Sequence, residues 1–371
     1  MSQSYLYEDY NVGVITAIDY EMSAFRYMLD KEHPTLPTKE GDSNMYILGE
    51  YNGHNIVIAC LSGNQGKGAA AIAATNLSRT FPRIIWRFLI GIGGAVPSLE
   101  HDIRLGDVVI SMPEGRHGGV VQYDLGKEME DDFVLKGFLV PPPTLLRNVA
   151  QIMKSNHLIQ DNRVDEFISL MTKKSKQLSI FNRPSESRHP DILYEADYLH
   201  VTGERTCAEC NRSRTVDRET REVEGSMIHY GLIASGDRVM KSGTKRDKIA
   251  RKIGGVLCLE VGAAGIATEL PCIVIRGISD YSDSHKNDVW QYYAAAAAAA
   301  AGKEMLSYLS PINHSPGTSA PASSSNQRVP SAIDNWTGSR NEFHGIGIQQ
   351  KLVLEQYLLE MVRILVGGSE L

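Results

Sequence analysis

An acidic residue at the end of an apolar run is the first feature of this sequence that could do chemistry. The stretch IVIRGISDYSD begins with the apolar residues 273–275 and reaches Ser279 and Asp280 at the end of a predicted strand. In open α/β sheets, ligands bind at the carboxyl ends of the strands, and an acid placed there can donate a proton to a leaving group. The alternative is that Asp280 only caps the following turn, because Asp is common after a strand.

A second group of residues could bind a metal ion. His200 precedes Cys207 by seven residues, and Cys210 completes a Cys-x2-Cys pair. This spacing suits a structural zinc site, for which four ligands are usual, and His189 and His229 are candidates for the missing ligand. The alternatives are a pair of free thiols or a redox pair. A zinc ion here would pin the surrounding segment near the mouth of the active site.

Alternating strands and helices are predicted to position these residues. Apolar runs predict strands at 12–18, 45–50, 55–61, 84–94, 107–113, 228–237, 256–265 and 273–280. Helices are expected after the first strand, after a glycine-rich turn within 62–77, over about 243–252 and around the eight alanines at 294–301, which have high helix propensity. Strands that alternate with helices indicate a mostly parallel sheet, so we predict an α/β fold with a mixed central sheet flanked by helices.

The composition divides the chain into segments. Residues 126–225 are charged, contain prolines and read as helix-rich, so we interpret them as an insertion into a domain spanning 10–308. Residues 309–345 are rich in Pro and Ser and are predicted to be a disordered linker. Residues 346–371 predict an amphipathic helix, which either packs on its own domain or binds a partner.

Length and charge restrict the class of protein. The chain has 371 residues, 42% of them hydrophobic, which suits a soluble globular enzyme. A net charge of -6 gives no reason to expect nucleic acid as a partner. No apolar run approaches the roughly 20 residues of a membrane span, so no membrane partner is expected. Five cysteines make a disulfide framework unexpected, and the acidic N-terminus differs from a secretory signal. The sequence predicts a cytoplasmic or nuclear location.

Five motifs together resemble the nucleoside phosphorylase/nucleosidase family, and in particular its fungal branch, which is often joined to NTPase or repeat domains. They are GVITAIDYEMSAF (13–25), GIGGAVPS (91–98) with RLGDVVIS (104–111), GLIASGD (231–237), LCLEVGAAG (257–265) and IRGISDYSDSHKN (275–287). The motifs follow the family's order over about residues 10–308. The resemblance implies a three-layer phosphorylase-like fold, a homo-oligomer and a small-molecule purine nucleoside or nucleotide as ligand, with no required cofactor.

The family's chemistry is cleavage of an N-glycosidic bond through a transition state in which the ribosyl group gains oxocarbenium character. The resemblance implies that Asp280 is the general acid toward the base, that Ser279 orients Asp280, and that Glu21 activates water. The alternative for Glu21 is a solvated acid in the first turn of a helix, where the helix dipole stabilises it.

The resemblance also implies residues that hold the substrate. Gly91, Gly93 and Gly94 let the backbone approach a ligand closely. Val239 and Met240 follow SGD at the position where the family places residues that face the base and ribose; ordinary core packing is the alternative.

His285, Lys286 and Trp290 are candidates for the rim of the pocket, and a solvated helix start is the alternative for this segment. Lys286 could meet substrate phosphates if the ligand is a nucleotide.

The arginines that bind phosphate in phosphorylases have no matching pattern in this sequence. Arg26, Arg104 and Arg116 are interpreted as surface residues, which favours water over phosphate as the nucleophile.

One motif departs from the family. The family reads E-M-E-A-A-G, and its second Glu grips the ribose hydroxyls, whereas this chain has Glu260, Val261 and Gly262. Two charge-assisted hydrogen bonds of about 1.5–3 kcal/mol each are lost. If they strengthen in the transition state, the rate falls roughly 10²–10⁴-fold, and Glu260 could compensate only through a bulged backbone. The leading function is therefore an N-ribosyl hydrolase, and the alternatives are a weakened purine-binding or signalling module and a phosphate-dependent phosphorylase.

Overall fold

The computed structural model describes residues 5–204, 206–221 and 225–311. The predicted C-terminal helix and most of the predicted linker lie outside these residues. No helix in the described part of the chain is both long and apolar enough to cross a membrane.

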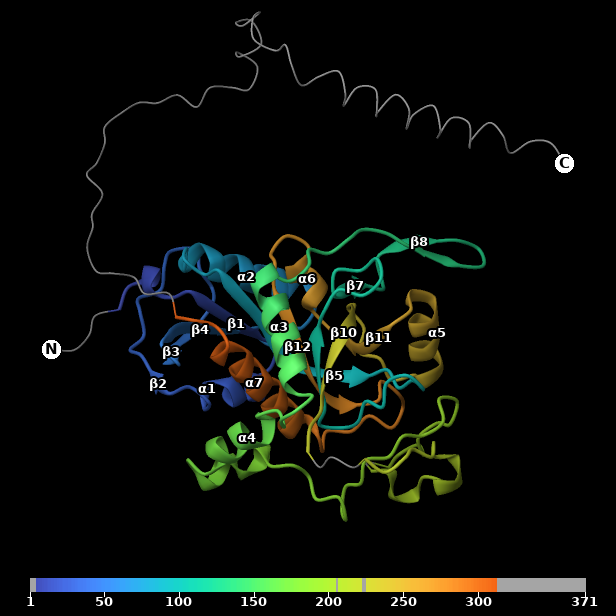
Figure 1. Cartoon of the computed structure of the whole chain (residues 1–371). Helices are drawn as coiled ribbons and strands as arrows, with labels where there is room; N and C mark the ends of the chain where they lie inside the picture. Colours follow the sequence, from blue (N-terminus) through green and yellow to red (C-terminus); the bar gives the residue numbers. More distant parts are fainter. Residues whose placement is uncertain (1–4, 205, 222–224, 312–371) are drawn as a thin grey trace, which may run out of the picture. The chain divides into compact units, whose positions relative to one another are not determined.

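A mixed sheet forms the centre of the fold, with the strand order β11-β10-β6-β12-β5-β1-β4-β3-β2 and with β7 beside β10 (Figure 1). The strands are β1 (Val12–Thr16), β2 (Lys31–Glu32), β3 (Tyr46–Tyr51), β4 (His54–Cys60), β5 (Trp86–Ala95), β6 (Val108–Ser111), β7 (Val120–Gln122), β10 (Ile228–Ser235), β11 (Val256–Glu260) and β12 (Ile273–Asp280). β5 runs parallel to β1 and β12. Its last residues also pair with β11, which closes five of the strands into a ring.

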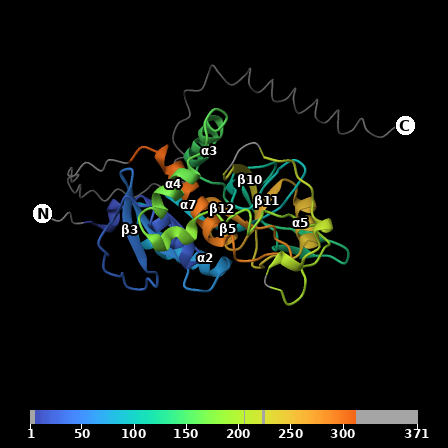
Figure 2. The same ribbon diagram turned by 90° about the horizontal axis from the view of Figure 1, so that it is seen from below.

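Helices cover both faces of the sheet, as Figures 1 and 2 show. They are α1 (Asp19–Arg26), α2 (Lys67–Thr80), α3 (Thr144–Asn156), α4 (Val164–Thr172), α5 (Gly243–Ile253), α6 (Ala263–Ala267) and α7 (Gln291–Ser307). α7 lies on β12, β5 and β6 and is surrounded by α1, α3 and α4. α2 packs against α6, β1 and β4. The predicted α/β fold with three layers is confirmed.

The alanine run of α7 is part of the core. All eight residues Ala294–Ala301 are buried. A Cβ atom added at Gly277 would collide with the carbonyl oxygen of Ala294, so glycine at this position of β12 lets the helix backbone lie directly on the strand. Small side chains on both elements therefore set the distance between α7 and the sheet.

The segment 126–225 contributes no strand to the central sheet in its described residues. Its strands β8 (Gly126–Glu128) and β9 (Phe133–Leu135) form a separate two-stranded sheet. α3 and α4 lie against α7, and the remainder is long loops with short 3-10 turns.

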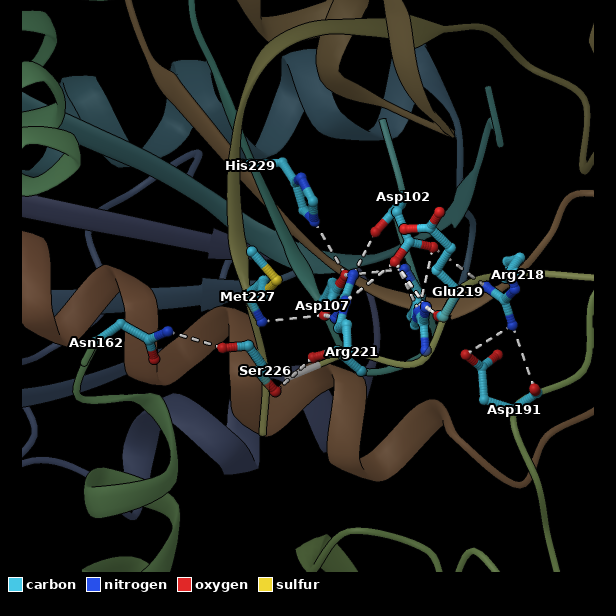
Figure 3. Close-up of polar contacts among 12 residues, drawn as sticks. Asp102, Asp107, Asn162, Asp191, Arg218, Glu219, Arg221, Ser226, Met227 and His229 are labelled. Atoms are coloured by element: carbon cyan, nitrogen blue, oxygen red, sulfur yellow. Dashed lines mark hydrogen bonds and ion pairs between the residues drawn. The ribbon is translucent and has the colours of Figure 1, made fainter. Parts of the chain in front are cut away.

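An ion-pair network holds the end of this segment to the sheet (Figure 3). The Arg221 guanidinium donates to both carboxylate oxygens of Asp107, at 2.8 and 2.6 Å, and His229 Nε2 donates to the same carboxylate at 2.9 Å. Arg218 donates to Asp191 at 3.0 Å. Burial alone would raise the pKa of Asp107, but the hydrogen bonds from Arg221 and His229 hold it at about 2.

Candidate active site

A cavity of about 290 Å³ lies at the carboxyl ends of β5, β11 and β12, beside the start of α1. Nine residues singled out from the sequence line it: Glu21, Gly93, Gly94, Val239, Met240, Glu260, Val261, Asp280 and Lys286. Ser279 does not line this cavity; its hydroxyl donates to Asp280 Oδ2 at 2.7 Å. Residues distant in the sequence thus meet at one edge of the sheet, where ligands of α/β proteins bind.

Glu21 is a buried carboxylate rather than a solvated acid. Its oxygens accept backbone N–H groups from Ala17 at 2.8 Å, Ile18 at 3.2 Å and Ile92 at 2.7 Å. Burial raises the pKa of Glu21, while the charge of Arg276 and these three hydrogen bonds oppose the rise. A carboxylate has about four acceptor positions, so one remains for a water molecule.

Arg276 lies in the middle of β12 and links the carboxylates of the site. It donates to Glu260 Oε2 in an ion pair whose side chains are 2% and 0% exposed. Glu260 also accepts the backbone N–H of Ala263 at 3.1 Å and so caps α6. The Glu260 carboxylate therefore stabilises the protein through Arg276 and α6, and it also lines the cavity.

Two glycines of β5 make room for the acids. A Cβ atom at Gly91 would collide with both Arg276 and Glu21, and one at Gly94 would lie 2.6 Å from Asp280 Oδ1. Both carboxylates line the same cavity, so a ligand bound there can contact Glu21 and Asp280 together.

Asp280 is held by polar contacts on both oxygens. Oδ1 accepts the backbone N–H of Ser282 at 2.9 Å. Oδ2 accepts the hydroxyl of Ser279 and the ammonium group of Lys286. Lys286, which the sequence placed at the rim of the site, is thus an ion-pair partner of the proposed acid, and a substrate nitrogen would compete with it for Oδ2.

The mouth of the cavity is partly apolar and partly basic. Val239 is 57% exposed, which is unusual for ordinary core packing, and Met240 lies next to it. The exposed Arg238 also lines the cavity and forms no ion pair with any described residue. An apolar surface suits a purine face, and the arginine is available to an anionic group on a ligand.

Gly262 lies outside the residues that line the cavity. Its φ of +120° is in the region that favours glycine, and a Cβ atom there would lie 3.7 Å from Ala70 on α2. The position thus turns the chain from β11 into α6 and faces α2. Of the three residues Glu260, Val261 and Gly262, only the first two reach the cavity lining.

The arginines considered for phosphate binding lie elsewhere. Arg26 pairs with Glu32 at 2.7 Å, Arg104 pairs with Asp102 at 2.8 Å, and Arg116 is exposed. None of the three lines the cavity.

Sequence reasoning missed several residues of the cavity. The sequence could have indicated Arg276, because a charged residue interrupts an otherwise apolar strand. No sequence pattern indicated Tyr20 and Gln291, whose side chains form a hydrogen bond of 3.0 Å. Their proximity depends on the packing of α1 against α7, which joins residues far apart in the sequence.

The predicted metal ligands come together on the loop segment beside this cavity. His200, Cys207 and Cys210 offer ligand atoms that all lie within 4.8 Å of one another. His229, one candidate for a further ligand, donates to Asp107 instead, and His189 is exposed. Two thiols and an imidazole are the donor types that zinc prefers.

Comparison with known proteins supports the resemblance seen in the motifs. Residues 11–162 match the family model of the phosphorylase superfamily. A nucleotide-binding leucine-rich repeat (NLR)-like protein from Hyaloscypha variabilis is 38% identical over 305 residues. These residues are 82% of this chain, which spans about 30% of the length of that relative.

Solved structures with the same fold include bacterial nucleosidases and a hydrolase. The 5'-methylthioadenosine/S-adenosylhomocysteine nucleosidase from Neisseria meningitidis has a TM-score of 0.52 and 19% identity, covering 81% of this chain and 99% of its own. The futalosine hydrolase of Helicobacter pylori has a TM-score of 0.52 and 16% identity, covering 81% and 98%. At these identities the similarity establishes the fold.

Proposed function

We propose, from the premise that this chain belongs to the phosphorylase superfamily, that it hydrolyses the N-glycosidic bond of a purine nucleoside or nucleotide. The observation that carries the proposal is that the buried carboxylates of Glu21 and Asp280 line the same cavity, together with Gly93 and Gly94 of β5. An acid and a base on two sides of a ligand are what hydrolysis of a glycosidic bond requires.

In the proposed reaction, the bond between the anomeric carbon and the base nitrogen breaks, and its electron pair goes to the base. Asp280 enters the step protonated, gives this proton to the leaving base and ends as the carboxylate that pairs with Lys286. A water molecule bonds to the anomeric carbon and gives its proton to Glu21. Burial raises the pKa of Glu21, which makes its carboxylate a stronger base than a solvated one.

Water is favoured over phosphate as the nucleophile because Arg26, Arg104 and Arg116 lie outside the cavity. The alternative of a phosphate-dependent phosphorylase is tested by whether cleavage requires phosphate.

A second candidate function rests on the ribose side of the site. Glu260 is committed to Arg276 and to the cap of α6, and Gly262 does not line the cavity. The site thus lacks the carboxylate that the family uses to grip ribose. The second candidate function is therefore a purine-binding or signalling module with little turnover.

The test is release of free base from adenosine, inosine, methylthioadenosine, AMP and ATP, with and without phosphate. Release without phosphate supports the hydrolase, and release only with phosphate supports a phosphorylase. Binding of a purine without release supports the binding module. Asp280→Asn should lose at least about 10²-fold in rate, whereas the control Asp161→Asn, at an exposed position, should not.

A further inference from the structure

We propose that His285 is the fourth ligand of a zinc site with His200, Cys207 and Cys210, and that this site ties the insertion to the loop that follows Asp280. The first three residues are already gathered, with ligand atoms within 4.8 Å of one another. A closed structural zinc site takes four ligands, so three alone leave the coordination incomplete.

His200 is oriented for metal binding. Its Nε2–H donates to the backbone carbonyl of Thr206 at 3.1 Å, which leaves Nδ1 as the nitrogen available to a metal. Zinc-bound histidines generally donate their other ring N–H to a carbonyl or carboxylate in this way, because the contact fixes the tautomer and the ring.

His285 is a buried imidazole whose polar atoms lack partners. The residue is 7% exposed, and neither Nδ1 nor Nε2 has a hydrogen-bond partner among the described residues. Buried polar groups left in this state are uncommon, because each forfeits its hydrogen bonds to water. A metal ion bound to one ring nitrogen supplies the missing partner.

His285 lies beside the three-residue group, although its ring nitrogens are not among the ligand atoms that lie within 4.8 Å of one another. Its ring centre lies 5.4 Å from that of His200, with an interplanar angle of 71°. Two imidazoles bound to one tetrahedral zinc through bonds of about 2.0–2.1 Å have ring centres on the order of 5 Å apart. The His285 ring stacks on Tyr194 at 4.0 Å, and Asp283 Oδ1 lies 3.7 Å from its Nδ1. Asp283 is thus near enough to steady the ring once Nε2 binds the ion.

The site connects the insertion to the proposed acid. His200 also donates its backbone N–H to Ser284 Oγ at 3.0 Å. This hydrogen bond joins the same two loops as the proposed zinc site. Lys286, the residue after His285, pairs with Asp280. A second cavity, of about 240 Å³, is lined by both Asp280 and Cys207. His285 is therefore a positioning residue that sets the loop carrying Lys286.

Metal content of the full chain tests the proposal directly. The wild type should hold about one zinc per chain after purification without added metal. His285→Ala and Cys207→Ser should each weaken zinc retention at least tenfold against a chelator. The matched control is His189→Ala, because His189 lines the same cavity but is exposed. A wild type without zinc, or zinc held equally well by His285→Ala, would overturn the proposal.

Two further measurements do not depend on whether the variants fold. X-ray absorption at the zinc edge of the wild type should give two sulfur ligands at about 2.3 Å and two nitrogen ligands at about 2.0–2.1 Å. One nitrogen with an oxygen in place of the second would exclude His285. Hydrogen exchange in residues 281–287 should rise when a chelator removes the ion, and unchanged exchange there would contradict the link to the Asp280 loop.

Discussion

Arg276 and Glu260 form an ion pair from which solvent is almost fully excluded, with side-chain exposures of 2% and 0%. Arg276 comes from β12 and Glu260 from the end of β11, where its carboxylate also caps α6. The charge of Arg276 in addition opposes the rise in the pKa of Glu21 that burial causes. One guanidinium group thus serves both the fold and the proposed water base.

Arg276→Met should lower the free energy of unfolding by about 3–5 kcal/mol, because it leaves the buried Glu260 carboxylate unpaired. Urea unfolding monitored by circular dichroism measures this change. The double variant Arg276→Met/Glu260→Gln removes both charges and keeps an acceptor for the cap of α6, so it should be more stable than the single variant. A single variant within 1 kcal/mol of the wild type would mean that the pair is not buried in solution.

Gly262→Glu should destabilise the protein by about 1–3 kcal/mol without raising turnover. If the ribose-binding Glu of the family were merely missing at this position, the substitution would raise turnover. However, the φ of +120° at Gly262 is strained for any other residue, and the position lies outside the cavity lining. Thermal unfolding and base release are the measurements. Gly68→Ala is the control, because that glycine lies within α2 and has open space at its Cβ position. Increased turnover in Gly262→Glu would show that the site can accept the side chain.

The sheet and the edge that carries the site were predictable from the sequence. Apolar runs marked eight of the ten strands in the described central sheet and missed the short strands β2 and β7. The glycines after the run 84–90 marked the place where a ligand approaches. Strand order in an α/β sheet then brings the carboxyl ends of neighbouring strands together. These features depend on local patterns, which a single sequence displays.

The contacts between residues far apart in the sequence, in the site and elsewhere in the fold, were not predictable. Asp107 and Arg221 are 114 residues apart, and nothing in either local sequence indicates the other. His285 read as part of a solvated helix start, because its burial depends on Tyr194 and other residues of the insertion covering it. Likewise, Arg276 was visible as a charge in an apolar strand, but its partner Glu260 was not identified.

Acid should weaken the docking of the insertion through Asp107. Its folded pKa of about 2 lies below the value near 3.9 expected for an unfolded chain, so its contribution is fully present above about pH 4 and is lost as the pH falls toward 2. The contribution is about 2–3 kcal/mol. Between pH 5 and pH 2, the unfolding free energy of the wild type should therefore fall by about 2–3 kcal/mol more than that of Asp107→Asn. Parallel curves would show that Asp107 has an ordinary pKa.

Gly94→Ala should reduce base release at least about 10²-fold while leaving the fold intact. The added methyl group would collide with Ser282 Oγ and lie 2.6 Å from Asp280 Oδ1, so the proposed acid must move. A well-placed general acid raises the rate about 10²–10⁴-fold, and displacement of Asp280 removes this contribution. Steady-state kinetics with circular dichroism as the folding control make the test. Full activity in Gly94→Ala would remove Asp280 from the mechanism.

Arg238→Ala should separate nucleotide from nucleoside substrates. Arg238 is exposed at the cavity mouth and forms no ion pair with any residue in the described part of the chain, so its guanidinium is available to a substrate phosphate. One lost charge-assisted hydrogen bond of about 1.5 kcal/mol lowers kcat/KM for AMP about tenfold, while that for adenosine should stay within about twofold. Arg116→Ala, at an exposed arginine outside the cavity, is the control and should change neither value. An equal loss for both substrates would place Arg238 on the part they share, and no loss for either would favour a nucleoside as the natural ligand.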